Sequence, residues 1–139
     1  MSARSFFDTN VLIYTDDRAA PAKQRRALEL LAEHRQAGTG VVSLQVLQEY
    51  FVTVTRKLHV EAQVARRKVE LLAEFDVAKL EVADVLAAID LHRLHGFSLW
   101  DALILQAATR TGCAVLFSEN MQQAREVGGV RIVNPFLNR

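Results

Sequence analysis

"FFDTNVLIY", residues 6–14, places one charged residue, Asp8, between two apolar runs. The residues "RSFFD" at 4–8 are typical of a short buried strand, and "NVLIY" at 10–14 is typical of a short helix or turn. A carboxylate buried between such segments costs free energy unless it has a partner. Asp8 is therefore the first candidate for a functional residue.

Strands and helices alternate along the rest of the chain. Hydrophobic spacing, serine caps and glycine stops predict where each element begins and ends. The strands are expected at 39–43, 76–80, 113–118 and 130–134, and the helices at about 21–38, 43–57, 61–75, 84–95, 98–112 and 121–126. This alternation predicts an α/β fold with a mostly parallel sheet of about five strands, covered by helices on both faces.

Length and composition narrow the class of protein. A chain of 139 residues favours one domain, 1–139. The 17 basic and 16 acidic residues nearly cancel, so any contact with nucleic acid must be local. The single cysteine, Cys113, excludes an internal disulfide and fits a reducing cytoplasm. No run approaches the roughly 18–20 apolar residues that span a bilayer, so we expect a soluble protein with no membrane contact.

Two more acids interrupt apolar segments. Glu49 lies in the helix predicted to start at Ser43, and apolar residues surround most of that helix, so Glu49 is either on a solvated margin or directed into a site. Asp101 lies in "SLWDALIL" at 98–105, where an acid in a first helical turn is stabilised as a cap. Because apolar residues flank it, Asp101 can cap the helix and serve a site at once.

A metal ion would explain all three acids if they converge. Asp8 follows the first predicted strand, and such folds bind ligands at the carboxyl ends of their strands. Three neighbouring carboxylates repel one another strongly without a cation. Mg²⁺ or Mn²⁺ suits carboxylate oxygens, whereas zinc is disfavoured because the four histidines form no HExxH pair and Cys113 stands alone.

Other chemistries lack their motifs. The sequence contains no GxxxxGK[ST] phosphate loop, no GxGxxG and no GxSxG nucleophile elbow. An aspartyl-phosphate enzyme would normally carry a second acid two residues after the first, and Asn10 occupies that position here. The chemistry left is metal-assisted hydrolysis of a phosphodiester by water.

Four stretches, taken in order, resemble a known family. They are "FFDTNVLIY" (6–14), "SLQVLQEYFVTVTRK" (43–57), "FSLWDALILQAA" (97–108) and "VLFSENM" (115–121). Together they resemble the PIN-domain nucleases, specifically the VapC-type toxins of bacterial toxin–antitoxin pairs. The resemblance implies a three-layer α/β/α sandwich and a Mg²⁺- or Mn²⁺-dependent endoribonuclease that cuts single-stranded RNA. It also implies a small antitoxin protein as partner and a homodimer.

The resemblance also assigns roles to particular residues. It implies three catalytic and metal-binding acids, Asp8, Glu49 and Asp101, and four supporting residues, Thr9, Asn10, Ser118 and Asn120. A metal ion, not a side chain, is then the expected partner of Asp8. The family often has an aspartate where this chain has Asn120, and the amide brings no charge to a second metal.

Two other functions fit the same residues. One is an RNA- or partner-binding module of the same fold with weakened catalysis, which Asn120 makes conceivable. The other is a housekeeping PIN nuclease without an antitoxin. The presence of all three acids favours the enzyme, and the small chain favours the toxin. Beside Asp101, Trp100 could stack a nucleic-acid base, although core packing is the more common role of such a residue.

Overall fold

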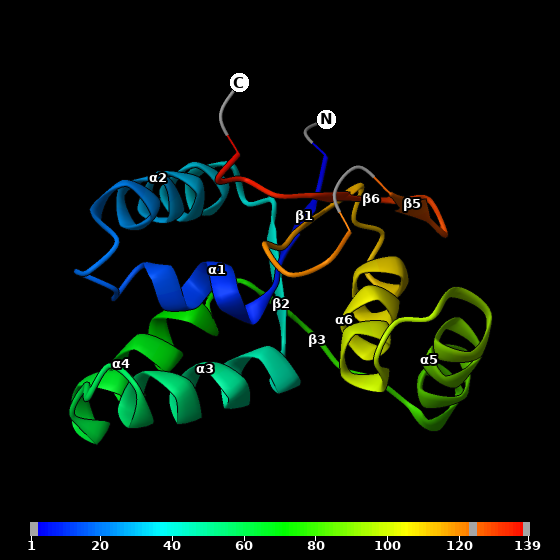
Figure 1. The fold of residues 1–139 in the computed structure, drawn as a ribbon, viewed down its shortest axis with the longest axis horizontal. Helices are drawn as coiled ribbons and strands as arrows, with labels where there is room; N and C mark the ends of the chain where they lie inside the picture. Colours follow the sequence, from blue (N-terminus) through cyan, green and yellow to red (C-terminus); the bar gives the residue numbers. More distant parts are fainter. Residues whose placement is uncertain (1–2, 123–124, 138–139) are drawn as a thin grey trace.

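A six-stranded sheet lies at the centre of the protein (Figure 1). The structure is a computed structural model that describes residues 3–122 and 125–137. The strand order is β3-β2-β1-β4-β6-β5, and only β5 and β6 pair antiparallel. The bounds are Ser5–Phe7 for β1, Gly40–Ser43 for β2, Asp76–Ala78 for β3, Val115–Phe117 for β4, Glu126–Val127 for β5 and Val130–Val133 for β6. The predicted mostly parallel sheet is confirmed, with one more strand than expected.

Helices cover both faces of this sheet. In Figure 1, α1 to α4 lie to the left of β1 and β2, and α5 and α6 lie to the right. Their bounds are Thr9–Tyr14 for α1, Pro21–Ala37 for α2, Leu44–Arg56 for α3, Ala62–Leu72 for α4, Val82–His95 for α5 and Leu99–Arg110 for α6. The three-layer arrangement implied by the resemblance is therefore confirmed.

Serine and glycine residues set several helix ends as predicted. The side chains of Ser43 and Ser98 cap α3 and α6 by accepting backbone hydrogen bonds. Gly38 ends α2 at a φ of 71°, a left-handed conformation that glycine adopts without steric cost. One start differs, because α5 begins two residues before Asp84. Asp84 instead accepts a 2.9 Å hydrogen bond from the Glu81 amide and so stabilises the first turn from inside.

The predicted helix near 121–126 is wrong for the residues that the structure describes. Met121 and Gln122 are irregular, and Glu126 begins β5. Residues 123–124 lie outside the described residues. Gly128 and Gly129 have φ values of 59° and 82°, which suit a tight hairpin turn, so the chain folds back as β5 and β6.

The core of the sheet is aromatic and apolar. Phe6 and Phe7 are fully buried. The ring of Phe7 packs against His34, Phe75 and Phe117, with ring centroids 5.5, 6.0 and 5.5 Å away. This aromatic packing fixes β1, and with it the position of Asp8 at the end of the strand.

Within residues 3–122 and 125–137, no helix has the length and apolar character that a membrane crossing would need.

A methyl group at Gly40 has no room beside this core. A Cβ atom at Gly40 would lie 2.5 Å from two ring carbons of Phe75. Because that ring must move, we expect Gly40→Ala to lower the free energy of unfolding by about 1–3 kcal/mol, as measured by denaturant titration. Adding Phe75→Leu should recover part of the loss. Equal stability of Gly40→Ala and the parent protein would contradict this packing.

Candidate active site

Asp8 joins the ends of the two central strands. It follows β1 and is the N-cap residue of α1. Its backbone amide donates a 3.0 Å hydrogen bond to the carbonyl oxygen of Phe117, the last residue of β4. Only 4% of Asp8 is exposed to solvent. The carboxylate is therefore fixed at the carboxyl edge of the parallel sheet, where α/β folds bind their ligands.

Three neutral donors hold the Asp8 carboxylate. Oδ2 accepts hydrogen bonds from the Ser118 hydroxyl at 2.7 Å and from Asn10 Nδ2 at 3.1 Å. Oδ1 accepts one from the Thr9 amide at 2.7 Å. The expectation that Asp8 lacks side-chain partners is thus wrong, because two side chains orient it. These donors leave its negative charge uncompensated.

The pKa of Asp8 reflects that uncompensated charge. Burial raises the pKa to about 6, although the hydrogen bonds from Ser118 and Thr9 act to lower it. The charges of Asp101 and Glu49 raise it further. Asp101 and Glu49 therefore lie near enough to Asp8 for their charges to act on it.

Glu49 is turned toward this cluster, not toward a solvated face. Its Oε1 accepts a 2.6 Å hydrogen bond from the Thr9 hydroxyl, at the start of α1. Its Oε2 accepts a 3.2 Å hydrogen bond from Gln45, one turn earlier in α3. The Gln45 amide also donates to the carbonyl oxygen of Trp100 at 3.3 Å. Glu49 is thus tied both to the helix that follows Asp8 and to the helix that carries Asp101.

Asp101 lies in the first turn of α6, as the sequence predicts. Its backbone amide donates a 3.1 Å hydrogen bond to the Ser98 hydroxyl, so it belongs to the capped first turn of α6. Its half-buried carboxyl has a raised pKa because of burial and the charge of Glu49, against the lowering effect of Ser98. Ser98 therefore caps the turn that carries Asp101, and the Asp101 carboxyl lies within reach of the charge of Glu49.

The donor set suits a divalent ion held partly by water. Within the part of the chain that the structure describes, Asp8, Glu49 and Asp101 form no ion pair with a basic side chain. In the same residues, no three histidine, cysteine or acidic side chains are arranged to hold one ion together. Mg²⁺ usually takes one or two carboxylates and keeps several waters, so these residues fit it without a closed cage. The ligand assignment stays a prediction.

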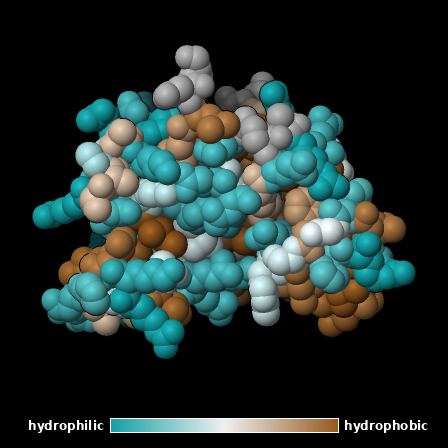
Figure 2. Space-filling model, in the orientation of Figure 1, coloured by the Kyte–Doolittle hydropathy of each residue, from teal (hydrophilic) through white to brown (hydrophobic). Residues whose placement is uncertain are grey.

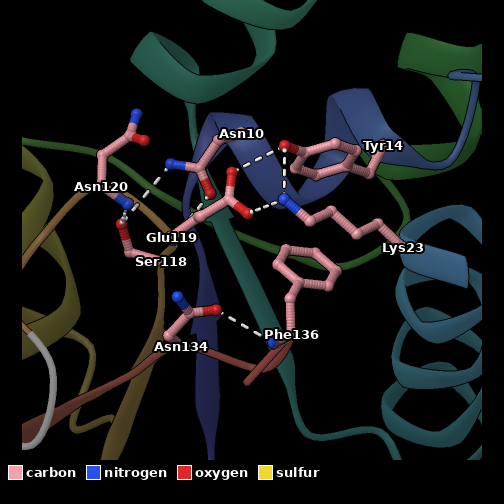
Figure 3. Close-up of polar contacts among 8 residues, drawn as sticks. All are labelled: Asn10, Tyr14, Lys23, Ser118, Glu119, Asn120, Asn134 and Phe136. Carbon is pink, nitrogen blue, oxygen red and sulfur yellow. Dashed lines mark hydrogen bonds and ion pairs between the residues drawn. The ribbon is translucent and has the colours of Figure 1, made fainter. Parts of the chain in front are cut away.

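The turn after β4 supports Asp8 through Ser118. Besides donating to Asp8, the Ser118 hydroxyl accepts hydrogen bonds from the amides of Asn120 and Met121, both at 3.3 Å. Asn10 Oδ1 accepts one from the Glu119 amide at 2.9 Å. Asn120 itself is exposed, and its side-chain amide extends away from Ser118 in Figure 3. Thr9, Asn10 and Ser118 are thus positioned to support the site, whereas Asn120 contributes a backbone contact.

The model of the PIN domain family matches residues 5–127, which include every residue of this cluster. The chain belongs to the PIN domain family. No curated protein matches its sequence closely enough to count as a relative.

Several solved structures share the fold, and two of them illustrate the likeness. One is VapC20 of Mycobacterium tuberculosis, described as a toxin that cleaves the sarcin–ricin loop, at 21% identity and a TM-score of 0.68, covering 84% of this chain and 91% of that one. The other is a toxin–antitoxin complex from Klebsiella pneumoniae, at 24% identity and a TM-score of 0.69, covering 95% of this chain and 98% of that one. At these identities the likeness establishes the fold.

One part of this PIN domain escaped prediction from the sequence. Glu119 accepts hydrogen bonds from the Tyr14 hydroxyl at 2.7 Å and from Lys23 at 2.5 Å (Figure 3). Burial acts to raise the pKa of Glu119, but the bonds from Lys23 and Tyr14 hold it below the usual value. The Tyr14 ring also meets Phe136 edge-on, with centroids 4.9 Å apart. No spacing in the sequence links these four residues.

This contact is expected to stabilise the turn that carries Ser118. Glu119→Gln keeps the size of the side chain but places an amide donor opposite Tyr14 or Lys23. We expect a loss of about 1 kcal/mol in the free energy of unfolding at neutral pH. Glu126→Gln, on the exposed edge of β5, is the matched control and should change little. Equal losses in both variants would mean that the contact adds no stability.

Proposed function

We propose that this PIN domain is a Mg²⁺- or Mn²⁺-dependent endoribonuclease that cuts single-stranded RNA, with residues 1–139 acting as one domain. The observation that carries the proposal is the gathering of Asp8, Glu49 and Asp101. They lie on three different elements, they repel one another, and no basic side chain among the described residues pairs with them. A fold keeps such a costly arrangement where a cation and a phosphate can use it.

Each acid has a distinct place in the proposed mechanism. Asp8 is the most rigid ligand, because Thr9, Asn10 and Ser118 fix both of its oxygens. Asp101 would bind the same ion directly or through water. Glu49, held by the Thr9 hydroxyl, would orient the attacking water or bind the ion. When bound, the divalent ion would supply charge neutralisation at the scissile phosphate and would acidify a nearby water.

We infer further that the protein is the toxin of a toxin–antitoxin pair. The shared fold with VapC20 and with the Klebsiella pneumoniae complex supports this inference. It entails a small antitoxin protein as partner, a homodimer and action in the cytoplasm, where RNA is available. Expression of the protein alone should slow bacterial growth, and Asp101→Asn should relieve that effect. Harmless expression of a demonstrably active enzyme would favour the housekeeping nuclease.

Incubation with end-labelled single-stranded RNA tests the enzyme directly. Cleavage should require Mg²⁺ or Mn²⁺ and should stop in excess EDTA. Returning the ion should restore it, which separates loss of the ion from unfolding. Full cleavage in excess EDTA would overturn the metal-dependent mechanism. Binding of RNA without any cleavage, with either ion, would favour the weakened binding module.

A further inference from the structure

Trp100 is the one tryptophan of the chain, and it lies on the surface. It is the second residue of α6 and directly precedes Asp101. In the folded protein, 62% of Trp100 is exposed. Core packing, its more common role, is therefore wrong here. An exposed indole of this size keeps a large apolar area in water, which costs free energy unless a ligand covers it.

The backbone of Trp100 is held beside the three acids by a hydrogen bond. The carbonyl oxygen of Trp100 accepts a 3.3 Å hydrogen bond from Gln45, whose amide also donates to Glu49 at 3.2 Å. One glutamine thus bridges the Trp100 backbone and a candidate catalytic acid. The next residue along the chain is another such acid, Asp101. Whatever covers the indole therefore lies next to the proposed site of cleavage.

Electrostatic attraction contributes little to RNA binding beside these acids. The net charge of the chain is +1, and the acids of the candidate site, Asp8, Glu49 and Asp101, would repel a phosphate. Electrostatic attraction usually supplies most of the affinity of proteins for nucleic acid. Stacking of a base on an aromatic ring does not depend on charge, and it tolerates any base. An exposed indole beside the acids offers a stacking contact for a base where electrostatic attraction is absent.

We propose that the indole of Trp100 stacks on a base of single-stranded RNA next to the phosphate that is cut. This proposal rests on the nuclease function above and adds a substrate-binding residue to it. A protein partner is the less favoured occupant, because a continuous apolar stripe lies elsewhere, on α5. It comprises Val82, Val85, Leu86 and Ile89, and Figure 2 shows the apolar surface at that position. Trp100 instead precedes Asp101 in the chain and is linked to Glu49 through Gln45.

Because Trp100 is the single tryptophan, its fluorescence reports directly on stacking. The probe is an unstructured RNA of about ten nucleotides, within the range of known single-strand sites. It is added to the parent protein in EDTA and to Asp8→Asn with Mg²⁺, so that the strand stays intact. Stacking should quench the indole fluorescence in step with binding, measured separately by anisotropy of a labelled strand. Binding of the strand with unchanged fluorescence overturns the stacking and leaves the nuclease function standing.

Affinity gives a second, independent measurement. In the Asp8→Asn background, Trp100→Ala should weaken binding roughly five- to hundredfold, and Trp100→Phe should restore part of it. Leu94→Ala, at a similarly exposed apolar position on α5 (75% against 62%), is the control and should bind as before. Removing one base at a time should reveal one position whose loss matters only when Trp100 is present. Equal affinity of Trp100→Ala, or additive losses at every position, overturns the proposal.

Two further outcomes are distinguishable. If neither protein binds RNA, both the stacking and the nuclease function are overturned. If Trp100→Ala changes the oligomeric state in size-exclusion chromatography and leaves RNA affinity unchanged, a second copy of the chain covers the indole, and the stacking alone is overturned.

Discussion

Replacing Asp8 by asparagine should lower the rate of RNA cleavage more than about 100-fold while the protein stays folded. Even partners that only support a metal ligand change activity about 10- to 100-fold, and Asp8 is proposed to bind the ion itself. The asparagine keeps the shape of the side chain and one oxygen for the Thr9 amide or the Ser118 hydroxyl. Initial rates at saturating Mg²⁺ measure the loss, and circular dichroism verifies the fold.

Asp90→Asn is the matched control for this experiment. Asp90 is an exposed aspartate on α5, and its contact is an ion pair with Arg93. The Asp90→Asn variant should cleave RNA at the rate of the parent protein. Glu49→Gln and Asp101→Asn should resemble Asp8→Asn. Near-normal cleavage by Asp8→Asn would place the catalytic ion elsewhere on the protein.

Without metal, the protein should become less stable as the pH rises from about 4 to 6. The pKa of Asp8 is raised from 3.8 to about 6 in the fold, so the folded state holds a proton that the unfolded state has released. Stability falls with rising pH wherever the folded state binds more protons. The raised pKa of Asp101 acts in the same direction. The penalty from Asp8, on the order of 2–3 kcal/mol, is complete above about pH 6.

Comparison with Asp8→Asn isolates this effect. Denaturant unfolding in EDTA, repeated across this range, should show a smaller decline in Asp8→Asn than in the parent protein. Glu119 and Asp84 have lowered pKa values, so their contributions are lost at more acidic pH and act in the opposite sense. Parallel curves for the two proteins would mean that Asp8 is not destabilised by its charge.

A bound divalent ion should reverse the penalty at pH 7. Mg²⁺ or Mn²⁺ at about 100 times its dissociation constant should add roughly 2.7 kcal/mol to the free energy of unfolding. The gain should shrink in Asp8→Asn, because one anionic oxygen near the ion is lost. An equal gain in both proteins would show that the ion stabilises the fold from another place.

Local signals determined most of the fold. The apolar run before Asp8 and the one around "AVLF" predicted two strands, and both lie at the centre of the sheet. Ser43, Ser98 and Gly38 set helix ends because capping depends on a few adjacent residues. The same local pattern, an acid at an element end inside an apolar run, singled out the three acids of the candidate site.

Contacts between distant residues were decided by the tertiary structure. Glu119 lies 96 positions from Lys23 in the sequence, and nothing local to either residue predicts their pairing. The donors to Asp8 follow two different strands: Thr9 and Asn10 come after β1, and Ser118, 110 positions from Asp8, comes after β4. β5 forms because β6 offers it an edge, whereas its own sequence allowed a helix.

Exposure was decided in the same way. The residues around Trp100 are apolar, and apolar residues predict burial, yet 62% of Trp100 is exposed, because later residues of α6, such as Ala102 and Leu105, form its buried face. The sequence by itself determined which residues carry the chemistry, since residue type and local spacing are written in it. Which of them meet, what holds them and which face the solvent depend on how the helices and strands pack, and only the tertiary structure decided that.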